Sequence, residues 1–320
     1  MTIAVLVPCY NEEATVADVV SGFAEALPQA SIHVYDNNSS DLTALKARQA
    51  GALVVREARQ GKGHVVRRMF ADVEADLYVM ADGDGTYRPE DAPLLVATLI
   101  TERADMVVGT RAGVSADAGR AGHAFGNRLF NRLYTGLFGR DFTDIFSGYR
   151  VFSYRFVKSF PAVSGGFEIE TEMSVHASQL RLPVAEVELP YGRRPAGSAS
   201  KLSTWRDGAR ILAMFAMLLK ETRPARFFGA LAALAMIASL MLGAPVLAEY
   251  AMTGLVPRMP TWILAVGLGV TALMLAATGL ILDSVARGRA EAKRMAYLAL
   301  PPVRSSRADA PRVAAVTRAA

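Results

Sequence analysis

Short apolar runs alternate with amphipathic stretches from the start of the chain to Ala112. The runs are rich in Val, Ile and Leu without polar alternation, which is typical of strands buried on both faces, and they are Ile3–Val7, Ile32–Tyr35, Leu53–Val55, Leu77–Met80 and Met106–Val108. The stretches between them have helical spacing, and they are Ala14–Leu27, Leu42–Ala50, Gly63–Val73 and Pro89–Thr101. This alternation predicts a Rossmann-like α/β domain with a parallel sheet covered by helices on both faces.

The pattern changes after Ala112. The segment from Arg120 to Lys158 is rich in arginine and aromatic residues and has helical stretches, and Glu168–Leu180 has the spacing of another helix. Val184–Leu189 alternates with a period of two, which predicts an antiparallel edge strand. Trp205–Leu219 gathers apolar residues on one helical face, so we expect a helix that lies at a membrane surface.

Two long apolar segments follow. Phe227–Ala248 and Trp262–Leu282 contain no charged residue, and at about 1.5 Å per residue each can cross a hydrocarbon core of roughly 30 Å. The alternative is a buried helical hairpin in a soluble core. Arginine and lysine flank the outer ends of the two segments, whereas the link between them has one arginine, so the positive-inside bias places both chain ends in the cytoplasm.

Composition supports a membrane protein and excludes several other classes. Hydrophobic residues make up 52% of the 320 residues, above the roughly 45–50% of a soluble domain. The net charge is +5, and the basic excess lies in the C-terminal third beside the apolar segments, so we expect anionic lipids and no nucleic acid as partners. The single cysteine, Cys9, excludes an internal disulfide and a thiolate zinc site.

The chain is therefore expected to have four parts. Residues 1–202 form a cytoplasmic α/β domain, because the start MTIAVLVPCYNEE lacks the features of a signal peptide. Residues 203–225 form the membrane-surface helix, and residues 226–283 form two transmembrane helices, about 227–248 and 262–282. Residues 284–320 form a basic cytoplasmic tail with a disordered end.

Polar clusters follow three of the predicted strands, at Asn11–Glu13, Asp36–Asp41 and Asp82–Gly85. Ligands of such sheets bind beyond the carboxyl ends of the strands. Asp82 and Asp84 are spaced so that their carboxylates point to the same side of extended backbone, and Gly83 between them allows a ligand to approach. Two such carboxylates suit Mg²⁺ or Mn²⁺ bridging phosphate oxygens, and a pair of turn-capping aspartates is the alternative.

Several segments together resemble a known family. VPCYNEEATV, VYDNNSSDLT, GKG at residues 61–63, ADGDGTYRPED and VVGTR resemble, in order and spacing, the family-2 glycosyltransferases of GT-A fold. TDIFSGYRVF and YGRRPAGSASKLS resemble the branch of dolichyl-phosphate mannose synthase and its bacterial relatives, which load sugars onto polyprenyl phosphate. The resemblance covers about residues 1–215, and the two apolar segments match the membrane-anchored members.

The resemblance implies a donor site. Pro8, Tyr10 and Glu12 match the motif around the nucleobase, and Asp36 matches the acid that holds the base or ribose. Lys62 matches a position near the donor diphosphate, with a solvated turn lysine as the alternative. Asp82 and Asp84 match the metal and diphosphate motif, whereas Thr86 stands where many relatives carry Gln or Ser.

The resemblance also implies an acceptor site. Arg111 matches an arginine that faces the acceptor phosphate, and Arg120 and Arg128 are two candidates for a second one. A basic loop that clamps phosphates is matched by Arg193, Arg194, Ser198 and Lys201.

Asp144 falls where related transferases with hydroxyl acceptors place a general base. A phosphate acceptor is already anionic, so Asp144 is then expected to orient an arginine or bind the acceptor head. A structural ion pair with Arg150 is the alternative.

These observations predict a membrane-anchored inverting glycosyltransferase. It would move a sugar from a UDP- or GDP-linked donor to polyprenyl phosphate of the undecaprenyl or dolichyl type, for cell-envelope glycans, with Asp84, Asp144 and Arg111 as catalytic residues. We expect a multi-pass protein of a bacterial-type cytoplasmic membrane, with lateral packing of the spans compatible with a homo-oligomer.

Two other functions stay open at this stage. One is transfer to a hydroxyl acceptor on a lipid or polysaccharide, although the Q-x-x-R-W element of processive synthases is represented only by Thr204-Trp205-Arg206. The other is a non-catalytic membrane scaffold, which the presence of both Asp82 and Asp84 disfavours.

Overall fold

The computed structural model describes residues 1–112, 142–166, 168–192, 213 and 216–303. The chain divides into two compact units. The sheet unit comprises Met1–Leu202 with Lys293–Ala320, and the hairpin unit comprises Ser203–Ala292.

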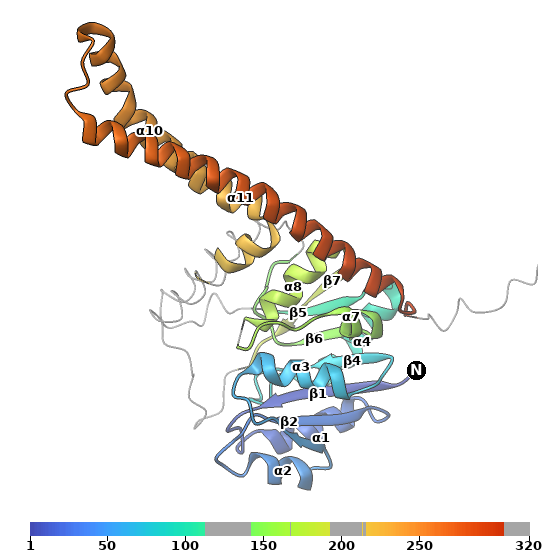
Figure 1. Cartoon of the computed structure of the whole chain (residues 1–320). Coiled ribbons are helices and arrows are strands. Elements are labelled where there is room, and N and C mark those ends of the chain that lie inside the picture. The colour runs from blue at the N-terminus through green and yellow to red at the C-terminus, as the bar shows by residue number, and fades with distance from the viewer. Residues whose placement is uncertain (113–141, 167, 193–212, 214–215, 304–320) are drawn as a thin grey trace, which may run out of the picture. The chain divides into compact units, whose positions relative to one another are not determined.

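The described part of the sheet unit contains a seven-stranded mixed sheet with the order β3-β2-β1-β4-β6-β5-β7 (Figure 1). Its strands are β1 (Ile3–Cys9), β2 (Ser31–Asp36), β3 (Leu53–Arg56), β4 (Leu77–Met80), β5 (Met106–Ala112), β6 (Arg150–Ser153) and β7 (Val184–Pro190). Neighbours pair in parallel except β6, which is antiparallel to both β4 and β5. The five strands expected between Met1 and Ala112 are thereby confirmed.

One strand of the sheet was not predicted, and the direction of another is the reverse of the expectation. The four buried residues of β6 fall in the arginine-rich segment for which helical stretches are expected, because a strand this short carries no periodicity of its own. The edge strand β7 was expected to be antiparallel, yet it pairs in parallel with β5. Its period of two reflects partial exposure at the sheet edge, which does not depend on the direction of the neighbouring strand.

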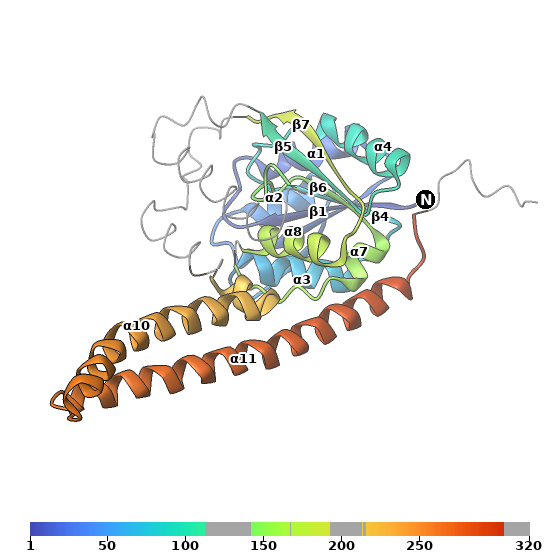
Figure 2. The same ribbon diagram turned by 90° about the horizontal axis from the view of Figure 1, so that it is seen from above.

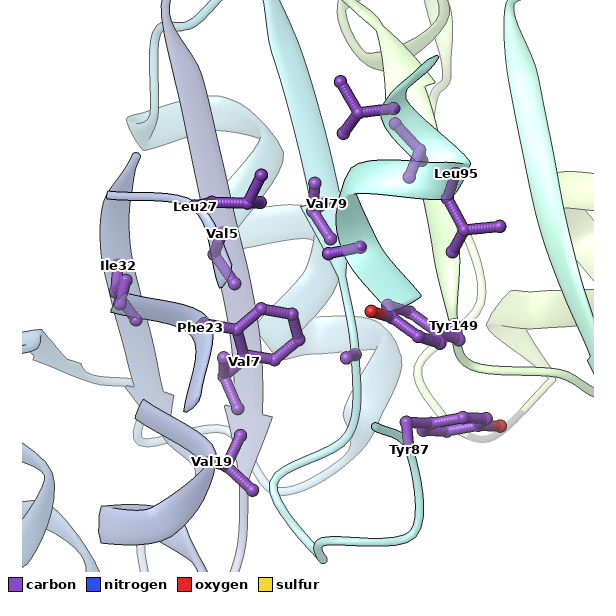
Figure 3. Packing of buried hydrophobic residues seen from close by; sticks show 14 of the residues in the cluster. Val5, Val7, Val19, Phe23, Leu27, Ile32, Val79, Tyr87, Leu95 and Tyr149 are labelled. Carbon is purple, nitrogen blue, oxygen red and sulfur yellow. The ribbon is translucent and has the colours of Figure 1, made fainter. Parts of the chain in front are cut away.

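Helices cover both faces of the sheet (Figure 2). On one face, α1 contacts α2 and α4, and on the other, α3 contacts α7 and α8. Their bounds are α1 (Val16–Ala26), α2 (Thr43–Gln49), α3 (Lys62–Asp72), α4 (Ala92–Glu102, preceded by the 3₁₀ turn η1, Pro89–Asp91), α7 (Tyr154–Ser159) and α8 (Ile169–Leu180). The core under α1 and α4 packs Val5, Val7 and Val79 of the strands against Phe23 and Leu95 (Figure 3).

The hairpin unit contains α10 (Pro224–Thr253) and most of α11 (Met259–Leu298). Both helices are long and apolar enough to cross a membrane. The Ser239 hydroxyl of α10 donates to the Ala265 carbonyl of α11 at 2.7 Å. Gly254, with φ of 69°, ends α10 in the left-handed region before the chain turns back. The two expected apolar helices are thus present and lie side by side.

The segment after Leu282, which is expected to be a basic tail, starts in a helix. Helix α11 continues to Leu298, and Lys293 onward belongs to the sheet unit. There the Tyr297 hydroxyl donates to the Asp105 carboxylate at 2.6 Å, and the Arg155 guanidinium lies 4.6 Å from the centre of the Tyr297 ring. Of the expected surface helix, residues 213 and 216–222 are helical and residues 203–212 lie outside the described part, as do residues 304–320.

Candidate active site

The polar clusters after β1 and β2 are bonded to each other at the carboxyl ends of these strands. The Asn11 amide donates to the Ser39 hydroxyl at 2.9 Å, and the Glu12 amide donates to the Thr43 hydroxyl at 2.8 Å. Strand β1 lies between β2 and β4, where the strand order reverses. This is the position at which open α/β sheets bind ligands.

The residues expected around the nucleobase lie at this edge. Pro8 is in β1 beside Tyr35 of β2, and Tyr10 and Glu12 follow in the next turn. Asp36 ends β2, is 4% exposed, and accepts from the Ser39 amide at 3.3 Å. The structure therefore brings the expected donor residues together, and their roles stay predictions.

Asn37 fixes the glycine-flanked turn that precedes α3. Its side-chain amide donates to the Arg59 carbonyl, and its side-chain oxygen accepts from the Gly61 amide, both at 2.7 Å. A side chain on Gly63 would lie 2.1 Å from the Ser164 carbonyl oxygen. The start of α3 is thus pressed against the loop before α8, and only glycine fits there.

Asp82 and Asp84 lie in the turn after β4. The Thr15 hydroxyl, next to the start of α1, donates to the Gly83 carbonyl at 2.7 Å, and a side chain on Gly83 would meet the Cys9 sulfur at 2.4 Å. The side chain of Asp82 is 30% exposed, whereas Asp84 is 4% exposed. Oδ1 of Asp84 accepts from both the amide and the hydroxyl of Thr86, at 3.1 and 2.6 Å. The Thr86 hydroxyl therefore orients a carboxylate of the motif.

Lys62 begins α3 and joins this turn to α8. Its ammonium forms ion pairs with Asp82 and with Glu170, and its side chain is 9% exposed. The alternative of a solvated turn lysine is therefore wrong. Burial disfavours the charge, but Asp82 and Glu170 outweigh burial and hold the pKa of Lys62 above its ordinary value.

The donor set at this edge fits a hard divalent cation. Among residues that the structure describes, no group of three or more His, Cys, Asp and Glu could hold a metal by themselves. Asp82 and Asp84 suit an ion that takes its other oxygens from phosphates and water. Burial first, and then the charges of Glu12, Asp36, Asp82 and Asp84, raise the pKa of the Cys9 thiol. The same concentrated negative charge favours a bound cation.

Arg111 and Asp144 form the other half of the site. At the end of β5, Nε and Nη2 of Arg111 donate to the two oxygens of Asp144 at 2.7 and 2.8 Å. Burial raises the pKa of Asp144, but the hydrogen bonds and charge of Arg111 outweigh it and hold the pKa below its ordinary value. Arg150 donates instead to the carbonyls of Ser147 and Ile145. The expected alternative of an Asp144–Arg150 pair is therefore replaced by a pair with Arg111.

Two tyrosines connect the halves. The Tyr87 hydroxyl accepts from the Gly148 amide at 2.8 Å, and a side chain on Gly148 would meet Asp82 at 2.7 Å. The ring of Tyr87 packs against Tyr191 at 5.4 Å between centres, and the Arg111 guanidinium lies 5.5 Å from the centre of the Tyr191 ring. Tyr87 is therefore linked through Gly148 to the surroundings of Asp82 and through Tyr191 to Arg111.

Several expected residues cannot be compared with the structure, and several others were missed. Outside the described residues lie Arg120, Arg128, Arg193, Arg194, Ser198, Lys201 and the Thr204-Trp205-Arg206 element. Glu170, Tyr87 and Tyr191 were not predicted. Glu170 is one turn before Met173 and Ser174 on a helix with few exposed positions, and this spacing was the available signal for a buried carboxylate.

Comparison with known proteins identifies the family. The model of "Glycosyl transferase family 2" matches residues 4–160. Glycosyltransferase AglJ of Haloferax volcanii is 38% identical over 71% of this chain and 75% of its own. Undecaprenyl-phosphate mannosyltransferase of Micrococcus luteus is 26% identical over 63% of this chain and 88% of its own.

A solved structure shares the fold of the sheet unit. Glucosyl-3-phosphoglycerate synthase of Mycobacterium tuberculosis, in complex with Mn²⁺, UDP-glucose and phosphoglyceric acid, aligns with a TM-score of 0.55 and 26% identity, over 68% of this chain and 79% of its own. With the carboxylate turn after β4 and the polar strand ends in place, the chain belongs to family 2 of the glycosyltransferases and has the GT-A type of sheet.

Proposed function

We propose that this protein is a membrane-anchored inverting hexosyltransferase that uses a nucleoside-diphosphate sugar as donor and a polyprenyl phosphate as acceptor. The product would be a lipid-linked sugar for glycan synthesis. The donor part rests on the carboxylate turn and on similarity to an enzyme solved with UDP-glucose. The acceptor part rests mainly on Asp144.

The state of Asp144 is the observation that carries the acceptor assignment. Both of its oxygens accept from Arg111, and its pKa is held low. A carboxylate with a low pKa is a weak base, so it is poorly suited to remove a proton from an alcohol. An acceptor phosphate needs no such base, and the undecaprenyl-phosphate mannosyltransferase named above acts on an acceptor of this class.

The donor half would hold the sugar diphosphate through the strand ends. Asp82 and Asp84 would bind Mg²⁺ or Mn²⁺ and Lys62 would face the diphosphate, while Pro8, Tyr10, Glu12 and Asp36 would surround the nucleoside. The divalent cation, when bound, neutralises charge that develops on the diphosphate leaving group. Thr86 keeps Asp84 oriented for that role.

The acceptor half would deliver the nucleophile. Arg111 would bind the acceptor phosphate through Nη1, which takes no part in its two bonds to Asp144. A phosphate oxygen would then form a bond to the anomeric carbon as the bond from that carbon to the diphosphate breaks, and the nucleoside diphosphate would leave with the electron pair. Arg128, Arg193, Arg194, Ser198 and Lys201 are proposed as further acceptor-phosphate ligands.

A hydroxyl acceptor is the second candidate. It is favoured by the solved glucosyl-3-phosphoglycerate synthase, whose complex contains phosphoglyceric acid. In that case Asp144 would need to release Arg111 before serving as a base.

Product analysis separates the two candidates. Purified full-length protein is incubated with UDP-, GDP- and dTDP-sugars, Mn²⁺ and either polyprenyl phosphate or phosphoglyceric acid, and products are identified by mass spectrometry. A glycosylated polyprenyl phosphate is the expected result. Transfer to phosphoglyceric acid alone would contradict the proposed acceptor.

The membrane arrangement is part of the proposal. Residues 1–202 would be the cytoplasmic catalytic domain, α10 and α11 would span a cytoplasmic membrane as a hairpin, and residues 284–320 would return to the cytoplasm. Arg223 and Arg226 precede the charge-free segment of α10, Phe227–Ala248, and Arg287 and Arg289 follow that of α11, Trp262–Leu282, which supports this orientation.

Topology reporters test this arrangement. A reporter fused after Ala320 should be cytoplasmic, and one inserted next to Gly254 should be extracytoplasmic. Detection of both on one side of the membrane would contradict the hairpin.

A further inference from the structure

The ammonium of Lys62 forms an ion pair with Asp82, a carboxylate that is proposed to bind the metal. It pairs with Asp82, whose side chain is partly exposed, and with Glu170, whose side chain is 5% exposed. Oε2 of Glu170 is buried and has no hydrogen-bond partner among the described residues. Lys62 is therefore shared between a carboxylate at the ligand edge and one in the interior.

Three contacts hold the backbone segments next to this ammonium, the turn at Gly61–Gly63 and the loop before α8. Asn37 holds Gly61, and the Ser164 carbonyl presses against Gly63. Glu172 of α8 accepts from the amides of Val163 and Ser164 at 2.9 and 2.7 Å, so the loop is tied to the first turn of α8. With the backbone held in this way, a departure of Lys62 from Asp82 would be a rotation of its side chain, with Glu170 still in reach.

Electrostatic repulsion determines whether Lys62 pairs with Asp82 or with Glu170 when a cation is bound. The ammonium of Lys62 lies between two acidic side chains, Asp82 and Glu170, so a divalent cation bound to Asp82 would have to share that carboxylate with it. A cation on Asp82 would also repel an ammonium in hydrogen-bond contact with the same carboxylate. Glu170 is then the remaining carboxylate partner of Lys62 in this group.

We infer that Lys62 is a resident counterion that occupies Asp82 until the metal–donor complex arrives and then turns to the donor diphosphate while paired with Glu170. Glu170 is thus a positioning residue that acts through Lys62. This inference rests on the proposed function for the identity of the donor. Its consequence is that Lys62 opposes binding of the metal alone and favours binding of the nucleotide with the metal.

Mn²⁺ binding to the purified full-length protein tests the first half. Free Mn²⁺ is measured by electron paramagnetic resonance without nucleotide. Lys62→Met should bind Mn²⁺ about tenfold more tightly than wild type, and Glu170→Gln about tenfold more weakly because Lys62 then has only Asp82. Lys62→Arg should not tighten binding, and Arg48→Met and Glu25→Gln, both at exposed positions, should match wild type.

Binding of UDP and GDP at saturating Mn²⁺ tests the second half. Lys62→Met should weaken binding of the preferred nucleotide about tenfold, since one charge-assisted contact is lost. The Lys62→Met/Glu170→Gln double variant leaves no unpaired buried charge. It should reproduce the Lys62→Met values within about twofold, and it replaces the single variant if that one does not fold.

The two binding measurements separate a failure of this inference from a failure of the proposed function. Weaker or unchanged Mn²⁺ binding in both variants that lack Lys62 overturns the counterion role. Failure of wild type to bind either nucleotide with Mn²⁺ contradicts the proposed donor, whereas tighter Mn²⁺ binding by Lys62→Met would still support competition at Asp82.

Discussion

The donor half and the acceptor half of the site are built in different ways. On the donor side, side chains at the ends of β1, β2 and β4 are fixed by short-range turns and by bonds between neighbouring strand ends, such as those from Asn11 to Ser39 and from Thr86 to Asp84. On the acceptor side, Arg111 is oriented by Asp144, which is 33 residues away. The proposed diphosphate site is thus built within the parallel strands of the α/β unit, whereas the proposed acceptor site also needs the segment that precedes the antiparallel strand β6.

Removing a carboxylate of the donor half should have the largest effect. Asp84→Asn should lower kcat/KM by about 10³-fold, since loss of metal-assisted charge stabilisation costs roughly 4 kcal/mol. Chelator should inactivate wild type, and Mn²⁺ or Mg²⁺ should restore it. Asp18→Asn, on the exposed side of α1, serves as the control. Full turnover in excess chelator would remove the metal from the mechanism.

Substitutions in the acceptor half should change the kinetic constants for the acceptor and leave donor binding nearly unchanged. Arg111→Ala should lower kcat/KM for polyprenyl phosphate tenfold to hundredfold, from loss of a charge-assisted contact of about 1.5–3 kcal/mol, with donor binding nearly intact. Arg48→Ala at the surface should behave as wild type. Both constants come from initial rates at varied donor and acceptor.

The Asp144→Asn variant provides the opposing outcome. If the acceptor is a phosphate, the rate of this variant plotted against pH should show no limb that arises from deprotonation of an alcohol. A loss of two to four orders of magnitude in kcat, together with normal acceptor kinetics in Arg111→Ala, would favour a hydroxyl acceptor.

A smaller effect is expected from the residue that orients Asp84. Thr86→Val removes the 2.6 Å hydroxyl bond but keeps the side-chain shape, so Mn²⁺ affinity should fall about tenfold, for a bond of about 1.5 kcal/mol to a charged group. Thr86→Ser retains the hydroxyl and should stay within about threefold of wild type. An unchanged Mn²⁺ affinity in Thr86→Val would show that Thr86 does not position the carboxylate.

A change away from both halves should alter stability without altering either substrate constant. His176 of α8 is 2% exposed, and burial first, then Lys293, lowers its pKa to about 3 in the folded protein. The unfolded chain, with a pKa of about 6.5, binds the proton more readily, so stability falls as the pH decreases from about 6.5 toward 3. Between pH 7 and pH 5 this residue should cost about 2 kcal/mol.

Denaturant unfolding of wild type and His176→Leu at the two pH values checks this expectation. On acidification the variant should lose less stability than wild type, by about the 2 kcal/mol that protonation of His176 in the unfolded chain contributes. Equal losses would show that folding does not lower the pKa of His176.

Local pattern determined the elements and the donor motif of this protein. The buried strands between Met1 and Ala112 lack polar alternation, and the helices between them have a regular period, so the type of each element follows from which faces it buries. Asp82 and Asp84 were identifiable because two acidic residues follow a buried strand at a spacing of two. Two charge-free segments of membrane length also identified α10 and α11.

Only the tertiary structure decided how distant residues are paired. The sequence indicated neither the antiparallel insertion of β6 nor the parallel direction of β7, because strand direction depends on the path of the connecting segments. It left Asp144 with open partners and did not mark Glu170, because a long-range ion pair between Lys62 and Glu170 has no periodicity along the chain. The side chains of Lys62 and Glu170 form an ion pair because the folded layers bury both of them next to each other. Burial of this kind arises only when the layers assemble.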